Sequence, residues 1–295
     1  MKLRGLGENQ LLARLLPKLT TNDSVVVGAG DDCAVVASSS GQQFQLLKTD
    51  CIVEGIHFAK EAPPKFIGWK AMARPLSDFA AMSGIPQFAL ITIIIPGERT
   101  LHWVQGIYRG LAEAALLFDV AIVGGETSNT QGPAVISVSV SGFAEKDRWV
   151  TRAGGKVADE LFVTGRLGGS LRGRHLKFTP RIEESRWLTK HFPIHAMMDL
   201  SDGLGSDLPR LARASNVGFA VDENALPRHR GCSAAQAISD GEDYELLFAI
   251  APSHSARLQK TWPKKFQKLL LTRIGCLSRK SQITNRKWKG YVHFQ

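Results

Sequence analysis

Acidic residues beside glycines are the part of this sequence best suited to chemistry. The stretch Val27-Gly28-Ala29-Gly30-Asp31-Asp32-Cys33-Ala34-Val35 has apolar residues at both ends, two glycines and two adjacent carboxylates. A glycine-rich loop at a strand end is typical of phosphate binding, but two acids there would repel a phosphate. A divalent cation removes the conflict, because Mg²⁺ takes oxygen ligands from carboxylates and phosphates alike. A polar hairpin turn is the alternative interpretation, since Gly and Asp both favour turns.

Similar acidic clusters recur along the chain, and the recurrence favours metal binding. The clusters are Asp31-Asp32, Thr49-Asp50, Ser77-Asp78, Gly124-Gly125-Glu126 and Asp199-Leu200-Ser201-Asp202-Gly203. Each follows a predicted strand or lies in or at the start of a predicted helix, so the clusters can converge on one cleft. Taken alone, Ser201 or Asp202 fits a plain helix N-cap better. Taken together, the carboxylates would hold more than one Mg²⁺, which commonly serves phosphoryl transfer.

Sequence signatures of other phosphoryl-transfer enzymes are missing. The chain contains no GxxxxGK[ST] loop and no protein-kinase signature. Phosphoryl transfer by this chain would therefore rely on metals and fixed carboxylates. Such a site suits a reaction whose barrier falls mainly through positioning and charge neutralisation.

The elements that would position these clusters are helices and strands in mixed order. Apolar spacing and turn residues predict helices over 8–19, from 63–64 towards 82, and over 101–118, 181–190 and 203–215. Strands are predicted over 25–27, 34–37, 44–50, 87–95, 120–123, 133–143, 160–164, 195–199, 219–221, 244–250 and 269–274. The strand over 120–123 is expected to be buried and to end at Gly124-Gly125-Glu126. The order shows no clean βαβ repeat, which favours an α+β fold over a Rossmann sheet.

Length and composition indicate two domains in a reducing compartment. The 295 residues, 44% of them hydrophobic, suffice for about two domains with real cores. The charged segment 145–156 predicts a boundary that gives domains 1–145 and 146–295. Apolar runs stay far below the roughly 20 residues of a membrane span, and no apolar signal region opens the chain. Four scattered cysteines argue against a zinc site or a disulfide framework, so we expect a cytoplasmic protein without a membrane partner.

The excess positive charge belongs to one end of the chain. The formal net charge is +10, but residues 251–295 contain eleven Lys or Arg and no acid, which leaves about −1 for residues 1–250. A nucleic-acid groove would need basic residues spread across the fold. The basic end is better explained as a solvated surface, so we expect no nucleic-acid partner.

Motifs along nearly the whole chain resemble the thiamine-monophosphate kinase family, within the superfamily of aminoimidazole ribonucleotide synthetase and selenophosphate synthetase. The motifs are Gly-Ala-Gly-Asp-Asp-Cys-Ala at 28–34, Thr-Asp-Cys-Ile-Val-Glu-Gly-Ile-His-Phe at 49–58, Leu-Ser-Asp-Phe-Ala-Ala-Met at 76–82, Gly-Gly-Glu-Thr at 124–127, Thr-Arg-Ala-Gly at 151–154, Asp-Leu-Ser-Asp-Gly at 199–203, Gly-Glu-Asp-Tyr-Glu-Leu at 241–246 and Trp-Lys-Gly-Tyr at 288–291. The resemblance implies a homodimer of two-domain α+β chains. It also implies the transfer of the γ-phosphoryl group of ATP to thiamine monophosphate with Mg²⁺, a step of thiamine diphosphate biosynthesis.

The resemblance also implies roles for individual residues. Metal ligands would be Asp31, Thr49, Asp50, Asp78, Glu126, Asp199 and Asp202, of which Asp31, Asp50, Asp78 and Asp202 would be catalytic. ATP would contact Tyr108, Gly125, Glu126, Arg152 and Ser201, and thiamine monophosphate would contact His57, Glu242 and Trp288. Arg152 suits a phosphate, and Trp288 offers a π face to the cationic thiazolium. Taken alone, His57 fits a structural histidine, and Trp288 fits a tail residue packed on the core equally well.

Three features depart from the family pattern. Glu126 stands where the family has Asp, and we expect it to remain a metal ligand because the neighbouring glycines let the backbone adjust. Lys48 stands where Ser is usual, and its charge would oppose one cation. The segment between Gly169 and His175 is shorter than usual, which would alter the second-substrate pocket.

Two other functions remain open from the sequence. One is an ATP-dependent synthetase of the same superfamily that acts on another small substrate, against which Trp288 and His57 argue. The other is a non-catalytic nucleotide-binding protein whose basic end contacts nucleic acid. Salt-sensitive retention of nucleic acid would distinguish the second from an enzyme.

Overall fold

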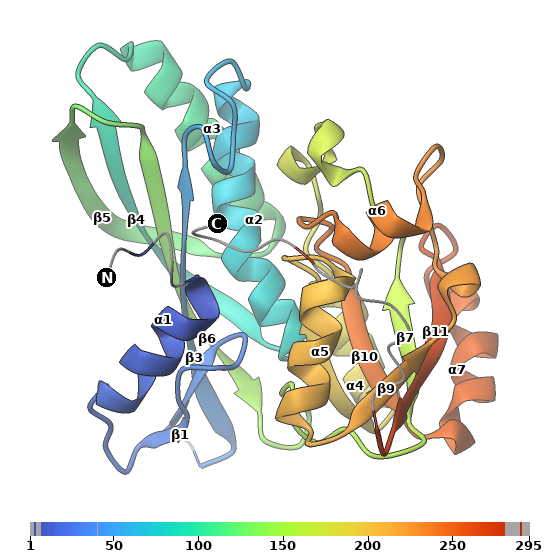
Figure 1. The fold of residues 1–295 in the computed structure, drawn as a ribbon. Helices are drawn as coiled ribbons and strands as arrows, with labels where there is room; N and C mark the ends of the chain where they lie inside the picture. The colour runs from blue at the N-terminus through green and yellow to red at the C-terminus, as the bar shows by residue number, and fades with distance from the viewer. Residues whose placement is uncertain (1–2, 4–6, 40, 281–289, 291–295) are drawn as a thin grey trace.

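The computed structural model describes residue 3, residues 7–39 and 41–280, and residue 290. Its elements fall into two halves, each built on one β-sheet, and the helix α2 lies between them (Figure 1). The N-terminal sheet has the strand order β1-β2-β3-β6-β4-β5, and the C-terminal sheet has the order β8-β10-β7-β11-β9. The two sheets with their helices confirm the predicted α+β class.

The N-terminal sheet is antiparallel except at one edge. Its strands are β1 (Val25–Val27), β2 (Ala34–Ala37), β3 (Gln43–Val53), β4 (Ile85–Pro96), β5 (Ala121–Thr130) and β6 (Val135–Glu145). Only β4 and β5 pair in parallel, and the helix α3 connects them. In β6, residues alternate between buried and half-buried, as a strand with one face on a core requires.

Helices cover one face of this sheet and leave much of the other open. The covering helices are α2 (Pro64–Ala81) and α3 (Leu101–Leu117), whereas α1 (Glu8–Leu15) and the 3₁₀ turn that follows it (Leu16–Lys18) precede the first strand. Alternate residues of β4, such as Ile91 and Ile93, pack with α2 and α3 in one core. Residues that point the other way, Phe88 and Leu90, are about half exposed, at 48% and 50%.

The C-terminal sheet is buried on both faces. Its strands are β7 (Glu160–Thr164), β8 (Ile194–Asp199), β9 (Gly218–Val221), β10 (Leu246–Ile250) and β11 (Leu271–Ser278), and its helices are α4 (Ile182–His191), α5 (Leu204–Ala214), α6 (Ala234–Ser239) and α7 (Pro252–Lys265). In the central strand β10, Leu247 packs with the core of α5, and Phe248 packs with the core of α4 and α7. This double burial explains why β10 is apolar at every position.

The helix α2 joins the two halves through side chains along its length. The Trp69 indole N–H donates to the carbonyl of Phe178 at 2.7 Å, and Ser77 Oγ donates to Asp199 at 2.6 Å. Beyond the helix, Arg186 of α4 binds Glu145 at the end of β6 at 2.6 Å. We retain 145/146 as a proposed boundary, since β6 ends at Glu145 and the next strand begins only at Glu160.

Most predicted elements are present, but one strand was described wrongly. The strand predicted over 120–123 is not buried and does not end at Gly124-Gly125-Glu126, because β5 runs on to Thr130 and is exposed along almost its whole length. The strand β5 lies at the edge of the sheet and pairs with β4 alone. Its first residues are apolar, like those of an interior strand, and this is why a buried strand was predicted. The sequence prediction also missed α6 and α7. None of the described helices combines the length and apolar character needed to cross a membrane.

Helices α2 and α3 approach closely at two glycines, which makes their packing sensitive to a single methyl group. A Cβ on Gly110 of α3 would lie 1.8 Å from the carbonyl oxygen of Lys65. A Cβ on Gly68 of α2 would lie 1.9 Å from the carbonyl oxygen of Ile107. Both contacts are with backbone atoms, so the helices themselves would have to separate.

We expect Gly110→Ala to lower the free energy of unfolding by about 3 kcal/mol, because overpacking forces α2 and α3 apart. Urea titration followed by circular dichroism measures the loss. Gly132→Ala is the control, since its Cβ would meet nothing nearer than Thr130 Oγ1 at 3.5 Å, and it should stay within about 0.5 kcal/mol of the parent. Equal stability of the two variants would contradict the close packing.

Candidate metal and substrate site

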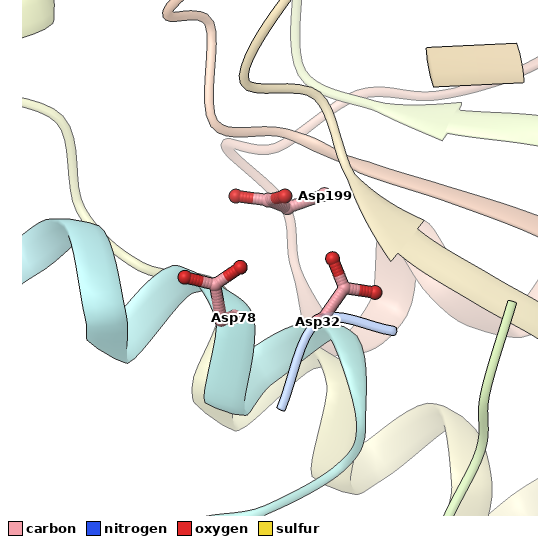
Figure 2. A group of neighbouring side chains, drawn as sticks. All are labelled: Asp32, Asp78 and Asp199. Carbon is pink, nitrogen blue, oxygen red and sulfur yellow. The ribbon is translucent and has the colours of Figure 1, made fainter. Parts of the chain in front are cut away.

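Three aspartates from distant parts of the chain converge where the two halves meet. Asp32 lies in the loop between β1 and β2, Asp78 lies near the end of α2, and Asp199 ends β8. One oxygen from each lies within 4.8 Å of the others, and all three residues are buried. Their carboxyl groups face a common space (Figure 2).

The surroundings of Asp199 fit a bound cation. Ser77 donates a hydrogen bond to Oδ2 of Asp199, but Oδ1 is buried and has no hydrogen-bond partner. A buried polar atom without a partner is rare and calls for an explanation such as an ion. Since Asp32 and Asp78 supply further oxygens beside it, the donor set is the one that Mg²⁺ prefers.

The carboxylates resist ionisation while no cation balances them. Burial, with the charge of Asp32 adding to it, raises the pKa of Asp199 to about 7. Burial raises the pKa of Asp78 well above its usual value although Lys48 opposes the shift. Burial and the charge of Asp32 raise the pKa of Asp31 to about 6. Without a bound cation, these carboxylates therefore carry more negative charge than their buried surroundings can stabilise.

Protein cations offset part of this charge. Arg152 binds Asp32 at 2.6 Å through its guanidinium, and its backbone N–H donates to Asp31 at 3.2 Å. The amine of Lys48 lies 3.0 Å from Asp78. Arg74 comes within 3.9 Å of the predicted ligand Asp50. Burial opposes the charge of Asp50, but the charges of Lys48 and Arg74 and a hydrogen bond with Asp78 together lower its pKa below the usual value.

A small cavity adjoins the aspartates and gathers predicted ligand-binding residues from both halves. Its volume is about 110 Å³, and its lining includes Ile56, His57, Arg74, Leu171, Ser201, Asp202, Gly241, Glu242 and Tyr244. The predicted substrate residues His57 and Glu242 thus line the same cavity as Ser201 and Asp202. Arg74 connects this cavity to the carboxylates, because it also approaches Asp50.

Glu242 is held in place by a buried lysine from α2. The fully buried amine of Lys70 donates to both carboxylate oxygens of Glu242, at 2.7 and 2.6 Å, and His175 Nδ1 lies 2.8 Å from Oε2. Burial opposes the charge on Glu242, but the contacts with His175 and Lys70 outweigh it and lower its pKa to about 2. Glu242 also has a φ of 62°, in the left-handed region that costs a residue with a Cβ. The contacts therefore fix both the charge and the direction of this carboxylate.

Asp202 belongs to a second polar group, at the start of α5. Its side chain binds Arg210, and its backbone N–H donates to Asp207 at 3.0 Å. The backbone N–H of Gly290 donates to Ser206 at 3.1 Å, which places Gly290 at the same helix end. The predicted substrate residue Trp288 lies outside the described residues.

Of the predicted metal ligands, Asp78 and Asp199 belong to the three-aspartate cluster, and four other predicted site residues contribute neither to it nor to the small cavity. Gly125 and Glu126 lie on the exposed edge strand β5, and Tyr108 is an exposed residue of α3. Thr49 lies on β3, where it accepts a hydrogen bond from Ser139 at 3.0 Å. With Lys48, Thr49 lines a hollow of about 400 Å³ on the open face of the N-terminal sheet.

Several residues of the site were not predicted from the sequence. A metal role was expected for Asp31 of the pair Asp31-Asp32, whereas Asp32 is the residue that lies in the cluster. No role was predicted for Lys70, Arg74 or Tyr244. Lys70 and Arg74 are cations inside an otherwise apolar helix segment, and that pattern was the signal available for them.

A larger, basic cavity is lined in part by Glu242 and Tyr244. It measures about 500 Å³, and its lining also includes Arg166, Ser170, Arg172, Gly173, Arg174, Lys177 and Arg181. Four of these residues lie between Gly169 and His175, the segment expected from the sequence to be shorter than in the family. A change of length there would therefore alter the wall of a cavity that borders Glu242.

Comparisons with known proteins agree over most of the chain. Residues 30–144 match the family model described as AIR synthase related protein, N-terminal domain, and residues 128–265 match the model of its C-terminal domain. Thiamine-monophosphate kinase of Rhodopirellula baltica is 40% identical, over 86% of this chain and 85% of the relative. The enzyme of Bacillus subtilis is 31% identical, over 98% of this chain and all of the relative. The solved structure of AaThiL complexed with AMPPCP and TMP superposes with a TM-score of 0.83 at 30% identity, covering 95% of this chain and 94% of that one.

We expect Mg²⁺ to stabilise the protein more at pH 8 than at pH 5. The pKa of Asp199, raised from 3.8 to about 7, means that the folded protein binds more protons than the unfolded chain between these values. Without a cation, this group therefore lowers the stability as pH rises from about 4 to about 7. Mg²⁺ binds the ionised form of Asp199 and so restores the stability that is lost at high pH. Thermal midpoints with Mg²⁺ and with EDTA at both pH values measure the effect.

The control for this experiment is Asp199→Asn. Its midpoint in EDTA should exceed that of the parent at pH 8, because one repelling charge is gone, and Mg²⁺ should add little. A Mg²⁺ effect that is equal at both pH values, or equal in Asp199→Asn and the parent, would contradict the assignment of Asp199 to a cation site.

Proposed function

Because the chain belongs to the thiamine-monophosphate kinase family, we propose that it transfers the γ-phosphoryl group of ATP to the phosphate of thiamine monophosphate, giving thiamine diphosphate and ADP. The observation that carries the proposal is the position of three buried aspartates beside a cavity lined by residues of both halves. The AaThiL structure described with AMPPCP and TMP shares the fold over 95% of this chain. Since the reaction consumes ATP, we place the enzyme in the cytoplasm.

Asp32, Asp78 and Asp199 would hold Mg²⁺, which neutralises phosphate charge and orients the reacting groups. The orphaned oxygen of Asp199 supports this assignment most directly. Further ligands in the proposal are Asp31, Thr49, Asp50, Glu126 and Asp202, for additional ions that would bind together with the nucleotide phosphates. Glu126 and Thr49 would require the bound nucleotide or a second chain to complete their sites, because both lie outside the cluster.

The nucleotide phosphates would lie between Arg152 and the start of α5. Arg152 already approaches the cluster through Asp32, so its guanidinium can bind phosphate without leaving the site. Ser201 lies just before α5, whose first backbone N–H groups favour anions. Gly125 and Tyr108 would contact the remainder of ATP.

Thiamine monophosphate would occupy the cavity that His57 and Glu242 line. Glu242 stays ionised because Lys70 and His175 hold its charge, so it presents a fixed acceptor to the cationic substrate. Arg74 lies between this cavity and the carboxylates, where it can orient the acceptor phosphate. Trp288 would add a π face to the cationic ring.

We expect Asp78→Asn and Asp199→Asn each to lower turnover by about a hundredfold or more, because losing a carboxylate ligand removes several kcal/mol of charge stabilisation. The assay contains ATP, Mg²⁺ and thiamine monophosphate, and chromatography follows thiamine diphosphate. Asp147→Asn is the control, since its side chain is 77% exposed, and it should turn over like the parent. Near-parental turnover in either cluster variant would contradict the role of the three aspartates.

The functional unit in our proposal is a homodimer formed through the open face of the N-terminal sheet. Large apolar side chains gather there: Leu47 is 41% exposed, Phe88 48%, Leu90 50% and Val123 57%. Contiguous exposed apolar surface of this kind marks an interaction site. We propose a second copy as the occupant, because the proposed ligand Thr49 lies in the hollow of this face and its site is incomplete within one chain.

We expect Phe88→Asp to make the protein monomeric, because a charge on this face would be buried without a partner. Analytical ultracentrifugation measures the mass. Leu116→Asp replaces an apolar residue of α3 that is 84% exposed, and this control should keep the parental mass. A parent that is monomeric at micromolar concentration would contradict the dimer.

A further inference from the structure

A lysine amine lies inside the acidic site, between two carboxylates. Lys48 extends from the middle of β3, and its Nζ is 3.0 Å from Oδ2 of Asp78 and 4.0 Å from Oδ2 of Asp50. Its side chain is only 21% exposed. Unlike a surface lysine, it therefore cannot exchange these carboxylates for solvent at little cost.

The three cations of the site contact different groups. Arg152 forms a close pair with Asp32, and Arg74 donates to the carbonyl of Cys51 at 3.0 Å. Arg74 also comes within 3.9 Å of Asp50. Among the described residues, Lys48 is the cation that lies within 4.0 Å of both Asp50 and Asp78.

The charges of the site leave room for one divalent ion. The ionisable groups that ion pairs link to the three aspartates are the carboxylates of Asp31, Asp32, Asp50, Asp78 and Asp199 and the cations of Lys48, Arg74 and Arg152. When all are ionised, the five negative charges exceed the three positive charges by two. One divalent cation among Asp32, Asp78 and Asp199 would balance this excess.

A second divalent ion would compete with Lys48 for the same place. An ion that bridged Asp50 and Asp78 would have to lie about 2 Å from an oxygen of each. The amine of Lys48 lies 3.0 Å and 4.0 Å from oxygens of the same two carboxylates, so it would repel such an ion at close range. A lysine ammonium is a compact point charge, so it can neutralise the pair without fixed coordination geometry. It also stays attached to the chain whatever the Mg²⁺ concentration.

We propose that the ammonium of Lys48 takes the place of a divalent ion between Asp50 and Asp78, so that this pair binds no metal of its own while Lys48 is present. The inference rests on the proposed metal site at Asp32, Asp78 and Asp199. Lys48 acts here through the carboxylates, as a charge-balancing residue. Removing its charge opens a further divalent-ion site.

The test counts Mn²⁺ ions bound per chain without nucleotide, by electron paramagnetic resonance of the free ion. Lys48→Ala should bind one ion more than the parent, and its thermal midpoint in EDTA should be lower and should recover with Mn²⁺. Lys48→Arg, which keeps the charge, should bind the parental number. Lys65→Gln is a control on a lysine paired with Glu113 on the surface, and it should match the parent in both measurements.

The outcomes separate this inference from the proposed function. Equal counts in Lys48→Ala and the parent, with binding in both, would overturn the role of Lys48 and leave the three-aspartate site standing. A parent that binds no Mn²⁺ would overturn both. If Lys48→Ala is insoluble, the count is taken on Lys48→Gln, which keeps most of the length of the side chain and removes its charge.

Discussion

The repulsion among buried aspartates at the junction of the two halves is the interaction on which the rest of the structure depends. Asp32, Asp78 and Asp199 come from a loop, a helix and a strand, and packing of the two sheets against α2 forces them together. Such an arrangement lowers the stability of the folded protein unless cations offset the repulsion. The raised pKa values of Asp78 and Asp199 reflect this unfavourable electrostatic energy. The protein supplies part of the positive charge and leaves the remainder to a bound ion.

Helix α2 links this electrostatic constraint to substrate binding. It carries Ser77 and Asp78 at the acidic cluster and, about two turns earlier, Lys70 at Glu242. The two groups therefore hold a fixed relation to each other, set by the rise of one helix. Arg74 lies between them on the same helix and reaches both Asp50 and the cavity. A cation site and a fixed carboxylate on a shared rigid element suit a reaction that depends on alignment.

Local patterns were sufficient to predict most elements and the general location of the chemistry. A short window of sequence is enough to recognise the acidic motifs, the long helix α2 and the strands β4 and β6. The exposure of β5 was not predictable in this way, because an edge strand and an interior strand can start with the same apolar residues. The part played by Asp32 rather than Asp31 in the cluster also depends on how one loop meets two distant elements. The pairing of Lys70 with Glu242 spans 172 positions, beyond the reach of any local pattern.

Anomalous diffraction from crystals grown with Mn²⁺ and a non-hydrolysable ATP analogue would test the central claim most directly. The account predicts an anomalous peak between the two halves, with oxygens of Asp32, Asp78 and Asp199 as ligands of one ion. A peak confined to other residues, or none between these three carboxylates in crystals with bound nucleotide, would contradict it.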